Sequence, residues 1–135
     1  MTTFYCPNCW REVSESATIC SHCHTNISER ISQTDYTGKL IAALQHKEPM
    51  TPVRAAWILG QRREQEAVPA LTKIVRKAKD AFLVESAVEA LGKIGGSTAS
   101  DAIRAAAHHS SLRVRVKARD VLKKLASRNA LLQNN

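Results

Sequence analysis

Residues 66–96 read EAVPALTKIVRKAKDAFLVESAVEALGKIGG, and this stretch decides the fold. Apolar side chains recur three and four residues apart in both halves of the stretch, which is the period of an amphipathic helix. Pro69 stands in a first turn, where a missing amide hydrogen costs nothing, and Asp80 stands where a side-chain oxygen would cap a second helix. The stretch therefore predicts two antiparallel helices, 66–78 and 81–94, joined by a short turn.

The second of these helices has a related copy on each side. The upstream copy reads VRAAWILGQRR, and the downstream copy reads VRVKARDVLKKLA. Each copy places a leucine four residues after an alanine, so that both lie on one helix face, and the small alanine lets a neighbouring helix approach closely. The aligned positions are Ala55, Ala87 and Ala118, followed by Leu59, Leu91 and Leu122.

Cap and breaker signals extend this pattern to about six helices with short breaks between them. A period of this length is typical of a helical repeat stack, and three repeats are about the minimum that buries a continuous core. An ordinary six-helix bundle is the alternative. The helices are expected near residues 35–46, 51–63, 66–78, 81–94, 101–109 and 111–128.

The repeats resemble the short HEAT-like repeats of phycobilin lyases and of many bacterial scaffold proteins. That family pairs an AVPAL helix with an A-x-x-A-L-G-x-I-G helix, and here residues 67–71 and 87–95 carry the two motifs. The resemblance weakens in the last repeat, where Lys123 stands in place of the family glycine. It implies an all-α fold, a right-handed HEAT-like helical repeat stack of about three helix pairs. Bilin-lyase chemistry is not implied, because a fold does not determine function.

A different motif precedes the repeats. Cys6, Cys9, Cys20 and Cys23 have the spacing C-x2-C-x10-C-x2-C. Each C-x2-C pair can form a tight knuckle that places two sulfurs at adjacent corners of a tetrahedron, and four such thiolates select Zn²⁺, with iron as a substitute occupant. With all four positions filled by protein, the ion would be structural. We expect metal binding to fold this segment, because it is too short to bury enough apolar surface alone.

The cysteine segment resembles the short bacterial four-cysteine zinc ribbons of the form YCPNCG…FCPxCG. Those ribbons place glycine after each second cysteine, where the chain turns with positive φ. Here Trp10 and His24 hold these positions, and Trp10 is expected either to cover the metal site and pack on the helices or to contact a partner. The competing interpretations are a histidine ligand from His22 or His24, two disulfides in an oxidising compartment, and a redox C-x-x-C pair.

These motifs divide the chain into a zinc ribbon at residues 1–26, a linker at 27–34, HEAT-like repeats at 35–129 and a disordered tail at 130–135. A repeat stack exposes apolar surface at each end and needs a cap. We expect the ribbon to cap the N-terminal end of the stack. This hypothesis fails if the ribbon moves independently of the helices.

The charge distribution indicates an acidic partner. The net charge is +8; two arginines against three glutamates leave −1 over residues 1–34, so +9 lies downstream. The last predicted helix is strongly basic, although the helix dipole alone favours cations at a C-terminus by about 0.3–1 kcal/mol each. Glutamates on the middle repeat interrupt the basic surface, and aromatic residues that could stack on bases make up only 4% of the chain. A protein is therefore the first candidate partner and nucleic acid the second.

Taken together, these features predict a non-catalytic adaptor or scaffold rather than an enzyme. The sequence holds no Gly-rich phosphate loop and no nucleophile–histidine constellation, and Gly95-Gly96 is typical of a helix terminator. An apolar membrane span and a secretory signal are also missing from the sequence, so a cytoplasmic location is expected. Partner contacts are expected on the face formed by the second helix of each repeat, together with Trp10. The residues expected on that face are Arg54, Arg62, Glu85, Glu89, Arg115 and Arg119.

Overall fold

The computed structural model describes residues 4–33 and 36–133. A small ribbon with two short strands comes first, and paired helices follow. In chain order the elements are β1 Phe4–Tyr5, β2 Glu12–Val13, α1 Ile27–Gln33, α2 Tyr36–Ala43, α3 Met50–Gln61, the 3-10 turn η1 Gln65–Ala67, α4 Val68–Lys77, α5 Ala81–Ile94, α6 Ser97–Ala106 and α7 Leu112–Gln133.

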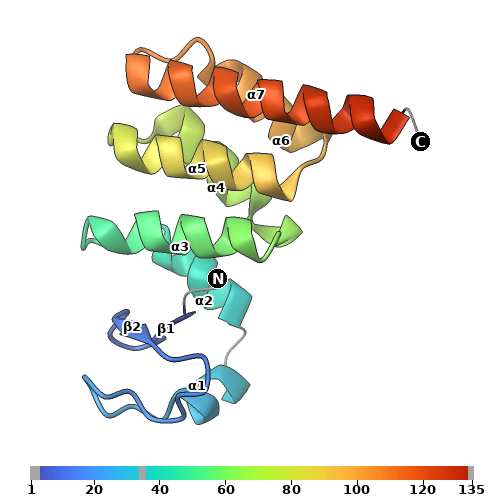
Figure 1. Ribbon diagram of the computed structural model, residues 1–135. Helices are drawn as coiled ribbons and strands as arrows, with labels where there is room; N and C mark the ends of the chain where they lie inside the picture. Colours follow the sequence, from blue (N-terminus) through green and yellow to red (C-terminus); the bar gives the residue numbers. More distant parts are fainter. Residues whose placement is uncertain (1–3, 34–35, 134–135) are drawn as a thin grey trace.

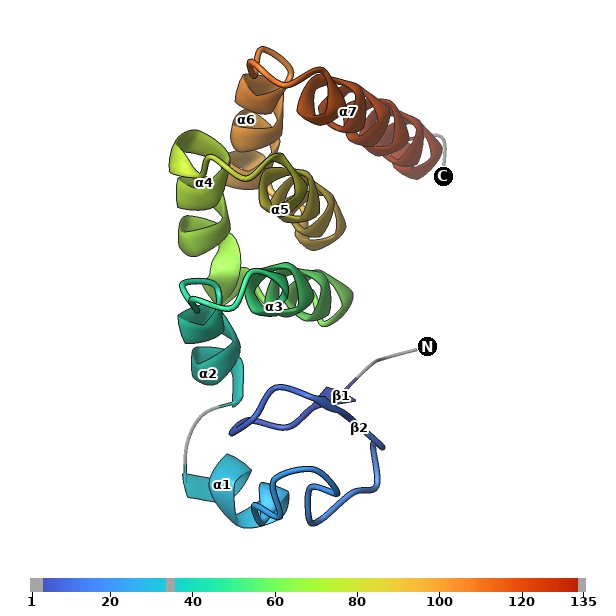
Figure 2. The same ribbon diagram turned by 90° about the vertical axis from the view of Figure 1, so that its left-hand side faces the viewer.

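The paired helices form two layers. Figure 1 shows α3, α5 and α7 one above another, and Figure 2 shows α2, α4 and α6 as a second column beside them. The helices of each pair pack on each other, and α5 packs on both α3 and α7. The prediction of an all-α HEAT-like stack of three helix pairs is therefore confirmed. We call α3, α5 and α7 the second-helix layer, and α2, α4 and α6 the first-helix layer.

The repeated alanine–leucine pairs form the centre of the core. The aligned alanine of every repeat is fully buried, and so are Leu59 and Leu91. Burying a leucine side chain contributes about 1.5–3 kcal/mol relative to leaving it exposed. Leu122, the equivalent leucine of the last repeat, is only half-buried, because α7 has no following second helix to cover it.

Glycine follows the leucine in the first two repeats because a neighbouring helix lies directly against it. A Cβ atom on Gly60 would lie 2.8 Å from Ala90 Cα, and one on Gly92 would lie 2.5 Å from Val121 Cγ1. The third equivalent position, Lys123, is exposed on α7. The departure from the family motif thus has a physical cause: the constraint that demands glycine is missing at this end of the stack.

The start of α6 differs from the sequence prediction. α6 begins at Ser97, about one turn before the expected start near Asp101. Gly95 and Gly96 have φ of 80° and 98°, which ends α5, and Ser100 N donates to Gly96 O at 3.0 Å. Because the glycine pair both terminates one helix and starts the next, α6 begins without a side-chain cap.

Two further helix ends depend on contacts that the sequence did not indicate. α3 begins at Met50, and the Glu48 carboxylate supports its first turn: it accepts hydrogen bonds from Met50 N at 3.0 Å and from Thr51 Oγ1 at 2.7 Å. These hydrogen bonds lower the pKa of Glu48. α7 continues through residues 130–133, where the sequence predicted the start of a disordered tail, and residues 134–135 lie outside the described part. By contrast, Asp80 caps α5 as predicted, accepting from Phe82 N at 2.9 Å.

The ribbon packs on the first repeat. β1 and β2 pair antiparallel, with Tyr5 opposite Glu12. Tyr5 and Trp10 both pack against the helical core, and the Arg54 guanidinium of α3 lies 5.7 Å from the centre of the Tyr5 ring. The ribbon therefore covers the N-terminal end of the stack, in agreement with the cap hypothesis.

A short helix occupies most of the interval that the sequence suggested as a linker. Glu29 N donates to Asn26 Oδ1 at 3.0 Å, which caps the start of α1. Ile27, the first residue of α1, is buried together with Cys6 and Cys20 in the small core of the ribbon. The start of this interval therefore belongs to the ribbon.

Candidate functional site

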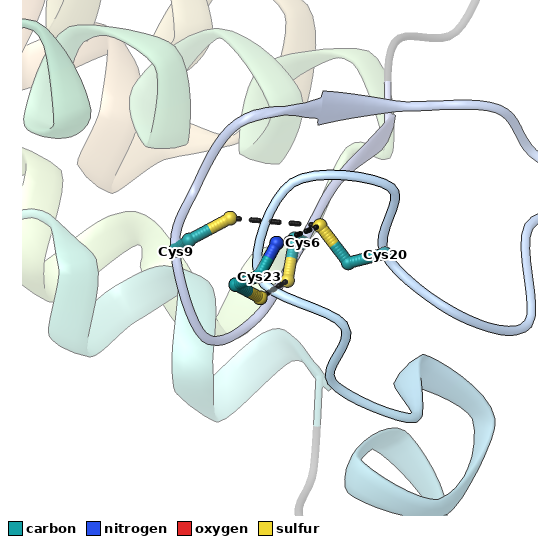
Figure 3. Close-up of side chains that lie close together, drawn as sticks. All are labelled: Cys6, Cys9, Cys20 and Cys23. Atoms are coloured by element: carbon teal, nitrogen blue, oxygen red, sulfur yellow. Dashed lines mark hydrogen bonds between the residues drawn. The ribbon is translucent and has the colours of Figure 1, made fainter.

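The four cysteines of the ribbon converge at one point. Cys6 and Cys9 lie on the loop after β1, Cys20 and Cys23 on the loop before α1, and Figure 3 shows their side chains pointing toward one another. All four sulfurs lie within 4.8 Å of one another, and the Cys6–Cys23 and Cys9–Cys20 sulfurs are 3.6 Å apart. A tetrahedral site with metal–sulfur distances near 2.3 Å would have edges of about 3.8 Å. The four residues could therefore hold a metal ion.

Both cysteine pairs sit in the same backbone turn. Trp10 N donates to Cys6 O at 2.9 Å, and His24 N donates to Cys20 O at 3.0 Å. Trp10 and His24 have φ of 63° and 62°, the left-handed conformation that favours glycine. This conformation costs a non-glycine residue about 1–2 kcal/mol. The two substitutions therefore keep the knuckle geometry at a local energetic cost.

The surroundings of the sulfurs divide the cluster into two unequal halves. Thr25 Oγ1 lies 3.1 Å from Cys23 Sγ, and hydrogen bonds with Thr25 lower the pKa of Cys23 to about 5. The amide of Cys23 lowers the pKa of Cys20 as well. Burial raises the pKa of Cys6 and, together with the neighbouring thiols, raises that of Cys9 to about 12. Hydrogen bonds from the chain thus favour charge on the second knuckle, burial opposes charge on the first, and metal binding would require all four sulfurs as thiolates.

Three residues that the sequence placed at a partner surface lie where the ribbon and the first repeat meet. Trp10 is half-buried against the helical core, and Arg54 is exposed beside the ribbon. The Arg62 guanidinium lies 5.3 Å from the centre of the Tyr36 ring, and its Nε lies 3.0 Å from Glu64 Oε1. Trp10 and Arg62 thus both have contacts within the chain.

The two glutamates of α5 bridge to α7. Arg113 Nε lies 2.6 Å from Glu85 Oε2, and Lys117 Nζ lies 3.5 Å from Glu89 Oε2. The Arg113 guanidinium also lies 4.3 Å from the centre of the exposed Phe82 ring. These contacts tie the last two repeats together at the open surface of the second-helix layer.

Arg115 and Arg119 lie on another side of α7. Arg115 Nη1 donates to the carbonyl oxygens of His109 and Ser110, at 2.9 Å each, and so holds the turn between α6 and α7. Arg119 follows one helical turn later and is exposed. The structure therefore separates these two arginines from the α5 glutamates with which the sequence grouped them.

A groove between α5 and α7 brings together cations that the sequence places on different helices. The groove has a volume of about 180 Å³. Two of its cations, Lys93 and Lys124, are equivalent repeat positions, each two residues after the aligned leucine, so the repeat alignment could have identified them. The cations around the groove are Arg63, Lys93, Lys124 and Arg128, and the floor consists of Gly92, Val121 and Leu125.

The first-helix layer carries a second groove, between α2 and α4. Its volume is about 400 Å³, and its lining includes Ile41, Leu44 and Ile74 with Lys73 and Lys77 at the edge.

Across the described residues, the cysteine cluster is the group of metal-ligating side chains that lies close enough together to hold an ion. None of the helices in residues 4–33 and 36–133 is both long and apolar enough to cross a membrane.

Comparison with known proteins agrees with this architecture. A family model described as HEAT repeats matches residues 37–127, from the start of α2 to well within α7. No curated protein and no solved structure matches the chain. Because the family match covers more than half of its length, the chain belongs to the HEAT-repeat family.

Proposed function

We propose that the protein is a non-catalytic adaptor that presents its second-helix layer to another protein. The observation that carries this proposal is the layer itself: α3, α5 and α7 lie side by side, and each carries charged side chains that reach solvent. Repeat stacks bind through such extended surfaces, with successive repeats contributing side by side. The proposed contact residues are Arg54, Glu85 and Glu89, with Arg62, Arg115, Arg119 and Trp10 at the edges of the face.

We propose Zn²⁺ as the resident ion of the cysteine cluster, with a structural role. The 3.6 Å sulfur pairs and the two equivalent knuckles support a tetrahedral thiolate site, for which Zn²⁺ is the usual choice. Binding of Zn²⁺ to comparable peptides contributes about 10–16 kcal/mol, which makes the ion the main source of order in so small a ribbon. The four free thiols support a reducing compartment, and with the bacterial character of the ribbon motif we propose a bacterial-type cytoplasmic protein.

Nucleic acid is the alternative partner. Its support is the net charge of +8 and the exposed cations of α7, among them Lys123, Lys124 and Arg128. A nucleic-acid partner predicts that the logarithm of the affinity falls linearly with the logarithm of the salt concentration. A protein partner predicts binding that survives moderate salt and depends on the shape of the surface.

Site-specific photocrosslinking in the native cell tests the adaptor proposal. A benzophenone amino acid replaces Arg54 or Glu89 on the second-helix layer, and Lys73 or Arg104 on the first-helix layer serves as the matched control. We expect crosslinked protein adducts from the first two positions and few from the controls.

The chemistry of the adducts separates the two partners. Adducts that nuclease digestion removes would favour the nucleic-acid alternative. Equal crosslinking from both layers, or crosslinking from neither, would contradict a binding role for the second-helix layer.

A further inference from the structure

The groove between α5 and α7 concentrates positive charge on an open surface. Within the described residues, Arg63, Lys93 and Arg128 form no salt bridge, and Lys124 pairs with the exposed Asp120 at 3.2 Å. Cations held close together repel one another. Four of them around one recess therefore favour the approach of an anionic group.

The helix dipole explains two of these cations and leaves two unexplained. Arg63 lies two residues after Gln61, the last residue of α3, and Lys93 lies in the last turn of α5, where a cation is favoured. Lys124 and Arg128 both lie more than one turn before Gln133, the end of α7. Because the dipole effect fades within the last turn, it does not account for them.

The floor of the groove suits an apolar side chain. Val121 is buried, and Leu125 and Gly92 are half-buried beside it. An apolar cavity of about 150 Å³ accommodates a benzene ring. The groove, at about 180 Å³, therefore has room for one leucine or phenylalanine side chain.

The lining suits a peptide better than a nucleic acid. A phosphate backbone gains nothing from an apolar floor. Base stacking needs aromatic side chains, and none of the residues that line this groove is aromatic. An acidic peptide with one apolar side chain uses both the cations and the floor.

We propose that this groove binds an acidic segment of the partner protein, with one apolar side chain on Gly92, Val121 and Leu125 and carboxylates against the surrounding cations. The proposal rests on the adaptor function above and specifies the site through which it acts. A buried apolar anchor within a charged rim is the arrangement that concentrates binding energy at protein interfaces, and the charges of the rim speed association and select the partner.

Two labelled peptides test this proposal with the metal-loaded full chain. In the first, glutamate and aspartate flank a central leucine, and in the second, serine replaces that leucine. Fluorescence anisotropy measures affinity, and amide chemical shifts locate the site. We expect the leucine peptide to shift the amide signals of Gly92 and Leu125. It should also bind at least about tenfold more tightly than the serine peptide, because its apolar side chain becomes buried.

A pair of charge-reversal variants separates the groove from general electrostatics. Lys93→Glu/Arg128→Glu is expected to weaken binding about tenfold or more. Arg76→Glu/Lys79→Glu makes the same change of net charge at the far end of α4 and should leave the affinity within about twofold. Circular dichroism checks that both variants remain folded.

Several results would overturn the proposal. They are no binding of the leucine peptide, equal affinity for both peptides, equal loss in both variants, or displacement of the peptide by tighter-binding single-stranded RNA. Crosslinking at Arg54 that persists while the peptide fails would retain the adaptor function and remove the groove as its site.

Discussion

Replacing Gly60 by alanine tests how closely α3 and α5 pack. The new Cβ atom would lie 2.8 Å from Ala90 Cα and 3.0 Å from Ala90 Cβ. Ala90 is buried within α5, so neither atom can move aside unless the helix shifts. Overpacking costs about 1–3 kcal/mol, with a backbone collision at the upper end, and the better helix propensity of alanine offsets about 1 kcal/mol. We expect the free energy of unfolding to fall by about 2 kcal/mol.

Urea denaturation at saturating metal, followed by circular dichroism, measures this change. Gly92→Ala is the informative comparison, because its Cβ atom would meet a methyl group of Val121 that can rotate about χ1, and the net loss should stay below about 1 kcal/mol. Lys123→Ala changes the equivalent position without a facing helix and should stay within about 0.5 kcal/mol. A Gly60→Ala protein as stable as the wild type would refute the close approach of the two helices.

Three further predictions concern the ribbon and the start of α3. Chelation of the metal should unfold the ribbon, because metal binding contributes about 10–16 kcal/mol to the folding of such sites. An amide NMR spectrum that does not change after chelation would contradict a structural ion. His24→Gly relieves a left-handed backbone at an exposed position and should stabilise the ribbon by up to about 1 kcal/mol. Trp10→Gly relieves the same backbone conformation but also removes a half-buried indole, so it should destabilise the ribbon. Equal effects of the two variants in a chelator competition would argue against the packing of Trp10. The lowered pKa of Glu48 means that its carboxylate stabilises α3 at pH values above the pKa of an unfolded glutamate, and that this contribution is lost as the pH falls through the folded pKa. Glu48→Gln should therefore flatten the acid side of the curve of unfolding free energy against pH. An ordinary pKa for Glu48, measured by NMR, would contradict its role at the start of α3.

The fold could be predicted because its determinants repeat. An alanine and a leucine four residues apart recur in three copies, and all of these side chains except Leu122 are fully buried. Lys123 follows the same rule. It stands at the position equivalent to Gly60 and Gly92, and within the described residues no further helix packs against α7 there. The cysteine cluster was equally readable, because C-x2-C spacing places two sulfurs in one turn whatever surrounds it.

The partner surface could not be predicted in the same way. Periodicity shows that Arg115 and Arg119 share one side of α7 and that Arg113 and Lys117 share another, but it does not show which side lies beside α5. That depends on how α7 is rotated against its neighbours, which long-range packing determines. The hydrogen bond of Glu48 to the start of α3 could not be predicted for a similar reason. A carboxylate that precedes a helix accepts from its first turn only when the chain folds back toward that turn.

The two ends of the stack differ, and the difference separates metal binding from partner binding. At the N-terminal end, Tyr5 and Trp10 of the ribbon cover the first repeat, so a metal ion bound by the four cysteines would support the stability of α2 and α3. The groove lies between α5 and α7, and the ribbon contributes no residue to it. Repeat stacks are stabilised by nearest-neighbour contacts, so loss of order at one end weakens the far end least. Peptide affinity in the groove should therefore survive metal removal for as long as α5 and α7 remain folded, whereas an affinity that disappears with the metal would place the ribbon in the binding site itself.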